Sequence, residues 1–256
     1  MWVKAYCWAL VAVAVMAGSR IVPAEPEQTF SCKALRHGHA FLVWNEQNGP
    51  PRIVLTSVLF GKYTNGLEYQ VISAEGKPLT SGELDPGGKT EVADLPVSPR
   101  YLVMAEPGYN GVVLSVDRPY GMVARRTRSL QPNAPTGFLY FYVPPECKKF
   151  DLVVCCRSPR EGARVVVHRP DGSAAGTLDG DLDEETALSV NVPAGTGDAV
   201  WSVEFLPPTA PNTFLDDVVV FLDGQLPPVL CPQRDWAQKI AKEAWRIDKA
   251  LKSQNR

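Results

Sequence analysis

Histidine is scarce in this sequence, which contains three among 256 residues. A nucleophilic enzyme usually places a histidine base beside its serine or cysteine, so this scarcity leaves few candidate catalytic sites. His37 and His39 flank a glycine in a turn-like stretch, and His168 ends a predicted strand. We expect solvated turn histidines at 37 and 39. The alternative is a copper or zinc pair, because alternate residues of an extended chain point to one side.

Catalytic motifs are missing as well. The chain has no Gly-x-Ser-x-Gly and no glycine-rich phosphate loop opening a helix, which are signatures of hydrolases and nucleotide-binding enzymes. The acidic segment 179–185 lies in a glycine-rich turn, where a solvated loop is expected rather than the paired carboxylates of a glycosidase. The sequence therefore predicts a protein without enzyme activity and without a bound cofactor.

Neither an excess of one charge nor a membrane-spanning apolar run is present. Lysine and arginine number 26 against 28 acidic residues, so no nucleic-acid partner is expected. The 14 apolar residues from Ala5 to Gly18 follow Lys4 and are shorter than the roughly 20 residues that cross a bilayer. They are typical of a secretory signal peptide, predicted here as residues 1–24, with an uncleaved anchor as the alternative. We expect a secreted or periplasmic protein.

Cysteine usage follows from that prediction. Cys7 would leave with the signal peptide, and five cysteines would remain: Cys32, Cys147, Cys155, Cys156 and Cys231. An oxidising compartment favours disulfide pairing, and an odd number leaves at least one thiol unpaired or bonded to another chain. The spacing of these cysteines matches no zinc motif, so a structural role is expected.

Short apolar runs separated by turn residues occupy most of the chain. Runs rich in Val, Ile, Tyr and Phe at intervals of about ten residues are typical of β-sandwiches. The sequence predicts an all-β protein with one sandwich over residues 25–124 and a second over 137–230. Residues 125–136 contain two prolines and three arginines and are predicted to form a linker or exposed loop.

The two predicted sandwiches share a pattern of residues. A strand end precedes a turn glycine at Gly76 and again at Gly172, and a large aromatic residue occurs at Tyr101 and at Trp201. Matching positions lie 94 to 100 residues apart, which is the usual size of this fold. We predict a tandem of two similar sandwiches, the alternative being unrelated sandwiches with the same strand–turn pattern.

The segment 231–256 has apolar residues at helical spacing, unlike the rest of the chain. Trp236, Ile240, Ala244, Ile247 and Leu251 recur every three or four residues and predict an amphipathic C-terminal helix. Its apolar stripe is expected to dock on the second sandwich, because a single amphipathic helix needs tertiary packing. The alternative is a partner-binding helix, in which Trp245, outside the stripe, would contact the partner protein.

Residues 138–222 resemble two exported bacterial β-sandwich types. Phe-Leu-Tyr-Phe-Tyr-Val-Pro at 138–144, the apolar strand 150–154 and Pro-Asp-Gly at 170–172 resemble the bacterial pre-peptidase C-terminal domain. The chain departs from that domain after Gly197, where paired tyrosines are absent. The strands 201–205 and 214–220 resemble the last strands of jelly-roll carbohydrate-binding modules. These resemblances imply a non-catalytic accessory module that binds polysaccharide, with Asp217 helping to hold a structural calcium ion.

Two hypotheses about function follow. In the first, exposed aromatic rings stack on sugar rings of a polysaccharide or surface glycan, with Tyr109, Tyr120 and Trp201 as candidates beside turns or strand ends. Trp201 has a second interpretation as the core aromatic between the two sheets. In the second hypothesis, the chain is a scaffold or adhesion protein that binds a protein partner through the C-terminal helix or a free sheet edge.

Overall fold

The computed structural model describes residues 30–31, 34–156 and 158–254, with side chains described for 34–156 and 158–244. The predicted all-β fold is confirmed: these residues form 18 strands and one C-terminal helix. The strands of the first half are β1 (Phe30–Ser31), β2 (Leu35–Arg36), β3 (His39–Trp44), β4 (Ile53–Val58), β5 (Leu67–Ser73), β6 (Pro78–Leu84), β7 (Lys89–Val92), β8 (Arg100–Glu106), β9 (Gly111–Val116) and β10 (Tyr120–Val123). Those of the second half are β11 (Phe138–Val143), β12 (Lys149–Cys156), β13 (Gly162–His168), β14 (Ala174–Asp181), β15 (Thr186–Asn191), β16 (Ala199–Leu206), β17 (Val218–Gly224) and β18 (Val229–Leu230).

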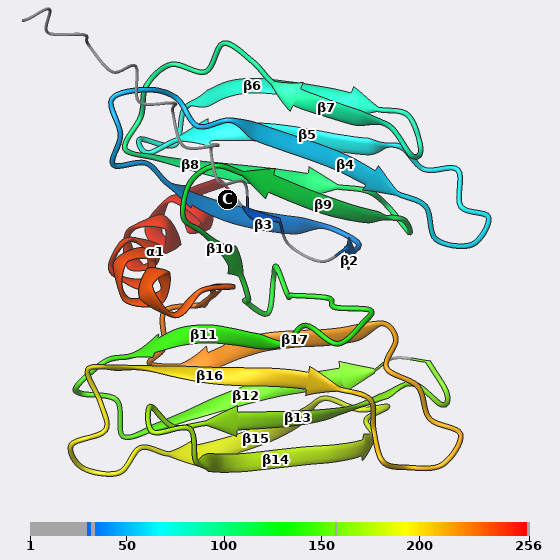
Figure 1. Ribbon diagram of the computed structural model, residues 1–256, viewed down its shortest axis with the longest axis vertical. Coiled ribbons are helices and arrows are strands. Elements are labelled where there is room, and N and C mark those ends of the chain that lie inside the picture. Colours follow the sequence, from blue (N-terminus) through cyan, green and yellow to red (C-terminus); the bar gives the residue numbers. More distant parts are fainter. Residues whose placement is uncertain (1–29, 32–33, 157, 255–256) are drawn as a thin grey trace, which may run out of the picture.

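A unit of seven consecutive strands occurs twice, and each unit forms a two-sheet sandwich (Figure 1). In the first unit the sheets run β3-β8-β5-β6 and β9-β4-β7, and in the second they run β11-β16-β13-β14 and β17-β12-β15. Within its unit, each strand therefore has the same neighbours as its counterpart in the other unit. The repeat predicted from residue spacing corresponds to a repeat of strand order.

The repeat extends to the turns. The β5–β6 and β13–β14 hairpins both turn at a glycine with positive φ, 82° at Gly76 and 86° at Gly172. The N–H of each glycine donates to a carbonyl three residues earlier, that of Ser73 at 3.0 Å and that of Arg169 at 2.9 Å. Side-chain-bearing residues rarely adopt this φ, which is why glycine marks both turns in the sequence.

One buried aromatic residue plays the same part in each sandwich. Tyr101 and Trp201 have no exposed surface. The Tyr101 hydroxyl donates to the carbonyl of Pro96 at 2.8 Å, and the Trp201 indole N–H donates to that of Thr196 at 3.1 Å. Each ring thus fills the core while its polar atom is satisfied five residues upstream. Trp201 is therefore the core aromatic, and its prediction as a sugar-binding residue is wrong.

The segment 125–136 is not an exposed linker, contrary to the prediction. Leu130 exchanges two 2.8 Å backbone hydrogen bonds with Val220 of β17, and Arg36 of β2 donates to the carbonyl of Gln131 at 3.1 Å. The segment therefore lies between an edge of each sandwich and is hydrogen-bonded to both. Edge strands offer unpaired backbone groups, and this pairing removes part of two such edges.

The chain returns to the first sandwich after the second one is complete. β18, predicted within the second sandwich, pairs with β10 of the first, with Leu230 opposite Met122. The next residue, Cys231, exchanges two 2.7 Å backbone hydrogen bonds with Tyr140 of β11. The predicted boundary at residue 230 is therefore wrong, because these residues join a sheet of one sandwich to a sheet of the other.

Helix α1 (Arg234–Gln254) covers this joint at one side of the molecule (Figure 1). Its predicted apolar stripe is buried at Trp236, Ile240 and Ala244. The helix contacts β3, β10 and β18 on one side and β11 and β16 on the other. We expected docking on the second sandwich alone, but the stripe contacts both. A single core cluster accordingly runs through both sandwiches and the helix.

No disulfide joins the four described cysteines to one another, so the expected pairing among them is wrong. Cys147, Cys155, Cys156 and Cys231 are all buried as small core residues. Burial raises the pKa of the Cys156 thiol to about 12, which keeps it protonated and unreactive. The predicted signal peptide, residues 1–24, and Cys32 lie outside the described residues. Within the part that is described, no helix has the length and apolar character to span a membrane.

The shared core predicts that both sandwiches unfold together. Ile240 is fully buried in α1. Changing it to alanine should lower the free energy of unfolding by about 2–5 kcal/mol. Urea unfolding followed by circular dichroism and by tryptophan fluorescence should show one shared transition at lower urea. Lys242→Ala, on the exposed side of the helix, is the matched control and should leave the midpoint unchanged. Two separate transitions in Ile240→Ala would contradict a single unfolding unit.

Candidate functional site

Two exposed tyrosines lie together at one end of the first sandwich. Tyr63 is 45% exposed and Tyr109 is 57% exposed. Their rings are stacked, with centroids 5.1 Å apart and planes 25° apart. The His37 ring meets Tyr109 edge-on at 5.9 Å. We call Tyr63, Tyr109 and His37 the aromatic platform. Two aromatic rings that stay exposed side by side form a contiguous apolar patch, which makes them a candidate binding surface.

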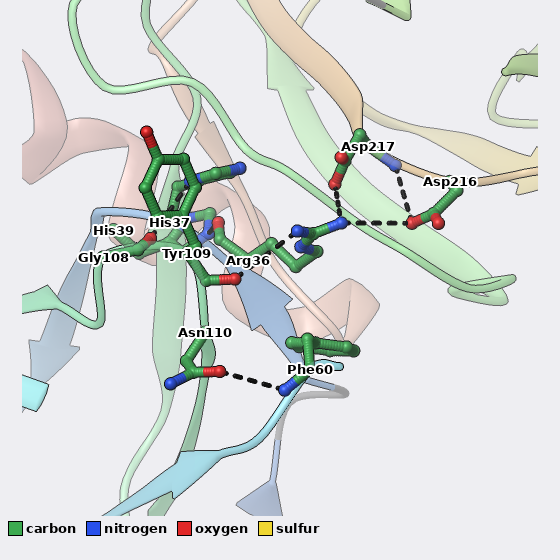
Figure 2. A network of polar contacts seen from close by, with 9 residues as sticks. All are labelled: Arg36, His37, His39, Phe60, Gly108, Tyr109, Asn110, Asp216 and Asp217. Carbon is green, nitrogen blue, oxygen red and sulfur yellow. Dashed lines mark hydrogen bonds and ion pairs between the residues drawn. The ribbon is translucent and has the colours of Figure 1, made fainter. Parts of the chain in front are cut away.

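Asn110 holds the two loops that carry the tyrosines. Tyr63 lies between β4 and β5, and Tyr109 lies in the turn between β8 and β9. The buried Asn110 amide donates to the carbonyl of Tyr63 at 3.2 Å and to that of Asn65 at 2.8 Å. Its side-chain oxygen accepts the N–H of Phe60 at 3.0 Å, a bond drawn in Figure 2. One fully paired side chain thus fixes the loop of Tyr63 beside Tyr109.

Gly108 permits the close approach of these loops. Its φ is 62°, and a Cβ atom there would lie 2.8 Å from the Asn65 side chain. Its carbonyl lies 3.0 Å from Nδ1 of His37, which orients the imidazole against Tyr109 (Figure 2). A larger residue at 108 would meet both backbone strain and a steric clash, so the loop geometry requires glycine.

An acidic groove of about 580 Å³ adjoins the platform. Asn65 and Gly108, the neighbours of the platform loops, line it together with four carboxylate residues, Glu68, Glu83, Asp85 and Glu106. No lysine or arginine is among its lining residues in the described part of the chain. Arg128 forms an ion pair with Glu106 from outside this lining. The groove therefore offers hydrogen-bond acceptors and a negative potential beside two aromatic faces.

The predicted sugar-binding tyrosines have different outcomes. Tyr109 is exposed and belongs to the platform. Tyr120 has no exposed surface and packs among Phe41 and Trp236, with ring centroids 6.5 and 5.8 Å away. Its prediction as a sugar-binding residue is wrong, because β10 is buried beneath α1. The side chain of Trp245, the predicted partner-binding residue, lies outside those described.

Asp217, the predicted calcium ligand, forms an ion pair with Arg36. Its carboxylate lies 2.5 Å from the Arg36 guanidinium, and its φ is 46°. Among the described residues, no group of three or more His, Cys, Asp or Glu is placed to hold a metal ion. The structure gives the predicted calcium site at Asp217 no further ligand from an acidic cluster, and the Arg36 ion pair already compensates the carboxylate charge in part.

Tyr63 and Asn110 were not among the predicted site residues. Tyr63 lies in the sequence Gly-Lys-Tyr-Thr-Asn-Gly at 61–66, where turn residues on both sides of an aromatic residue indicate a ring carried on a loop. That signal was available from the sequence. The contact of this loop with Tyr109 was not, because it joins segments more than 40 residues apart through Asn110.

Comparisons with known proteins add little. No protein-family model and no curated protein sequence matches the chain. A solved structure titled "Crystal Structure of the STIV MCP" is 8% identical, over 81% of this chain and 91% of that one, with a TM-score of 0.20. A similarity at that level supports no statement about fold or function. The resemblance to pre-peptidase and carbohydrate-binding domains stays a prediction.

His39 lies beneath the platform and is not the solvated turn residue that we expected. Its side chain is buried in β3, and Nε2 lies 2.6 Å from the Arg36 carbonyl. Burial lowers the pKa of His39 from 6.5 to about 4, because a charged imidazolium is poorly solvated there. His37 has positive φ, 62°, so the chain is not extended between the two histidines as the metal-pair alternative required.

This burial predicts a loss of stability in acid. Between pH 6.5 and about 4 the unfolded state binds a proton at His39 that the folded state does not, so unfolding becomes easier as pH falls. The loss should total on the order of 3 kcal/mol. His39→Gln keeps a donor for the Arg36 carbonyl but does not titrate, and should flatten this dependence in urea unfolding at pH 7, 5.5 and 4.5. An unchanged slope would contradict the assignment.

Proposed function

We propose that this chain is a non-catalytic carbohydrate-binding protein whose binding site is the aromatic platform with the acidic groove beside it. The observation that carries the proposal is the exposed, stacked pair of Tyr63 and Tyr109. Aromatic faces provide the apolar surface on which sugar rings stack, and a few polar groups at the edge fix their orientation. The predicted signal peptide supports export to a place where polysaccharides occur.

The groove determines which glycans are favoured. The carboxylates of Glu68, Glu83, Asp85 and Glu106 accept hydrogen bonds from sugar hydroxyl groups. Their charge repels uronic acids and sulfated sugars, because like charges brought together cost several kcal/mol. We therefore propose neutral or amine-bearing polysaccharides as ligands and exclude anionic ones.

The alternative, a protein partner bound through the C-terminal helix, has less support. The residues of the stripe that are described, Trp236, Ile240 and Ala244, are buried against the two sandwiches. A helix that uses its apolar face to join two sandwiches does not offer that face to a partner. Binding at a free sheet edge stays open as the second route of this alternative.

Each tyrosine of the platform should contribute to polysaccharide binding. Tyr109→Ala and Tyr63→Ala should each weaken binding about tenfold or more, the equivalent of about 1.4 kcal/mol, because each removes one stacking face. Binding is measured by affinity electrophoresis in gels that contain galactomannan, hydroxyethyl cellulose or glycogen. Polygalacturonate, an anionic polysaccharide, should not retard the protein.

Phe138→Ala is the matched control for these variants. Phe138 is 45% exposed, as Tyr63 is, but lies on β11 of the second sandwich. Its loss should leave mobility in every gel unchanged. The gels are run with calcium and with a chelator, and we expect no difference because Asp217 is already paired with Arg36. Equal retardation of wild type and Tyr109→Ala would contradict the site, and absence of retardation in every gel would contradict the function.

A further inference from the structure

Arg36 contacts both the aromatic platform and the second sandwich. One guanidinium nitrogen, Nη1, lies 2.5 Å from Asp217 Oδ1 and 3.7 Å from Asp216 Oδ1. The other, Nη2, donates to the carbonyl of Tyr109 at 3.4 Å. Figure 2 shows the guanidinium between the Tyr109 loop of one sandwich and the two aspartates of the other. The side chain of Arg36 is 11% exposed.

The planar guanidinium couples the position of Asp217 to that of the Tyr109 carbonyl. Nη1 and Nη2 are held in one rigid plane, so neither nitrogen can move without moving the other. A charge this deeply buried has to stay paired, since breaking a buried ion pair costs several kcal/mol. The position of Asp217 therefore restricts the position of the group that holds the Tyr109 carbonyl.

Asp217 is itself held firmly. It lies directly before β17, whose residues pair with β12 along their whole length. Its N–H donates to the side chain of Asp216 at 3.0 Å, and its backbone has a positive φ of 46°. Asp217 is thus held at the start of an edge strand of the second sandwich.

A second branch of the network reaches Tyr63. The Arg36 guanidinium carbon lies over the Phe60 ring, 5.3 Å from its centre. The N–H of Phe60 is bonded to Asn110, whose amide in turn holds the carbonyl of Tyr63. Both loops of the platform are therefore connected to the same guanidinium, one by a hydrogen bond and one through the packed Phe60 ring.

We propose that Arg36 is a positioning residue, and that its ion pair with Asp217 sets the stacked arrangement of Tyr63 and Tyr109. Ligand affinity on the first sandwich then depends on a carboxylate of the second. This inference rests on the proposed function, but the geometry of the platform can be tested without any ligand. The first half of the chain carries every residue of the platform and the groove, but it would not hold them in this arrangement by itself.

The test compares Asp217→Asn with Asp216→Asn. Both changes remove one negative charge, but Asp217 is the near partner of Arg36 and Asp216 the far one. Asparagine tolerates positive φ, so the backbone at 217 is kept. The protein is labelled with 3-fluorotyrosine, and the fluorine signals of Tyr63 and Tyr109 are assigned with the matching Tyr→Phe variants. Affinity is measured for the neutral polysaccharide that retards wild type most.

We expect Asp217→Asn to shift both fluorine signals and to weaken binding about tenfold, whereas Asp216→Asn changes affinity less than twofold. Wild-type signals in Asp217→Asn, or equal effects of the two variants, would overturn the link. If wild type binds no polysaccharide, the proposed function fails and the fluorine signals alone decide the link. Should Asp217→Asn unfold, Arg36→Lys is measured instead. It keeps the charge beside Asp217 but lacks the second nitrogen for the Tyr109 carbonyl, so the Tyr109 signal should still shift.

Discussion

Backbone hydrogen bonds of residues 229–231 determine how the two sandwiches are held together. β18 completes a sheet of the first sandwich beside β10, and Cys231 then bonds to Tyr140 of the second. Backbone groups buried between two sheets have to be paired, so this short return strand fixes the distance between the sandwiches. Helix α1 follows directly and covers the same joint with its apolar stripe.

The candidate site depends on that fixed arrangement. Loops carry function when a rigid scaffold positions them, and here the scaffold includes both sandwiches. Asn110 ties the two tyrosine loops to each other, whereas Arg36 ties the Tyr109 loop to Asp217 of the second sandwich. A hinge between the sandwiches would pull this network apart. The paired segment 125–136 and the shared core leave no room for such a hinge.

Local features of the sequence were sufficient to predict the all-β fold, a tandem of two similar sandwiches and the C-terminal helix, because each leaves a short-range pattern of apolar and turn residues. The number of strands in each repeat was not predicted, since polar strands such as β6, β7 and β14 carry no apolar run. The pairings between distant segments could not be predicted. Leu130 with Val220 and Arg36 with Asp217 join residues whose neighbours in sequence give no sign of the contact. Tyr109 and Tyr120 both adjoin turns, yet one is exposed and the other buried under α1, since burial depends on which element lies above.

The return of the chain has a consequence for biosynthesis. The ribosome completes β10 long before it reaches β18, and domains generally begin to fold in order of synthesis. The outer edge of β10 therefore has no strand beside it while the whole second sandwich is being made. An open edge is a template for pairing with other chains. The first sandwich to be synthesised is thus the last to be completed, and a chain that stops before residue 229 would keep that edge exposed.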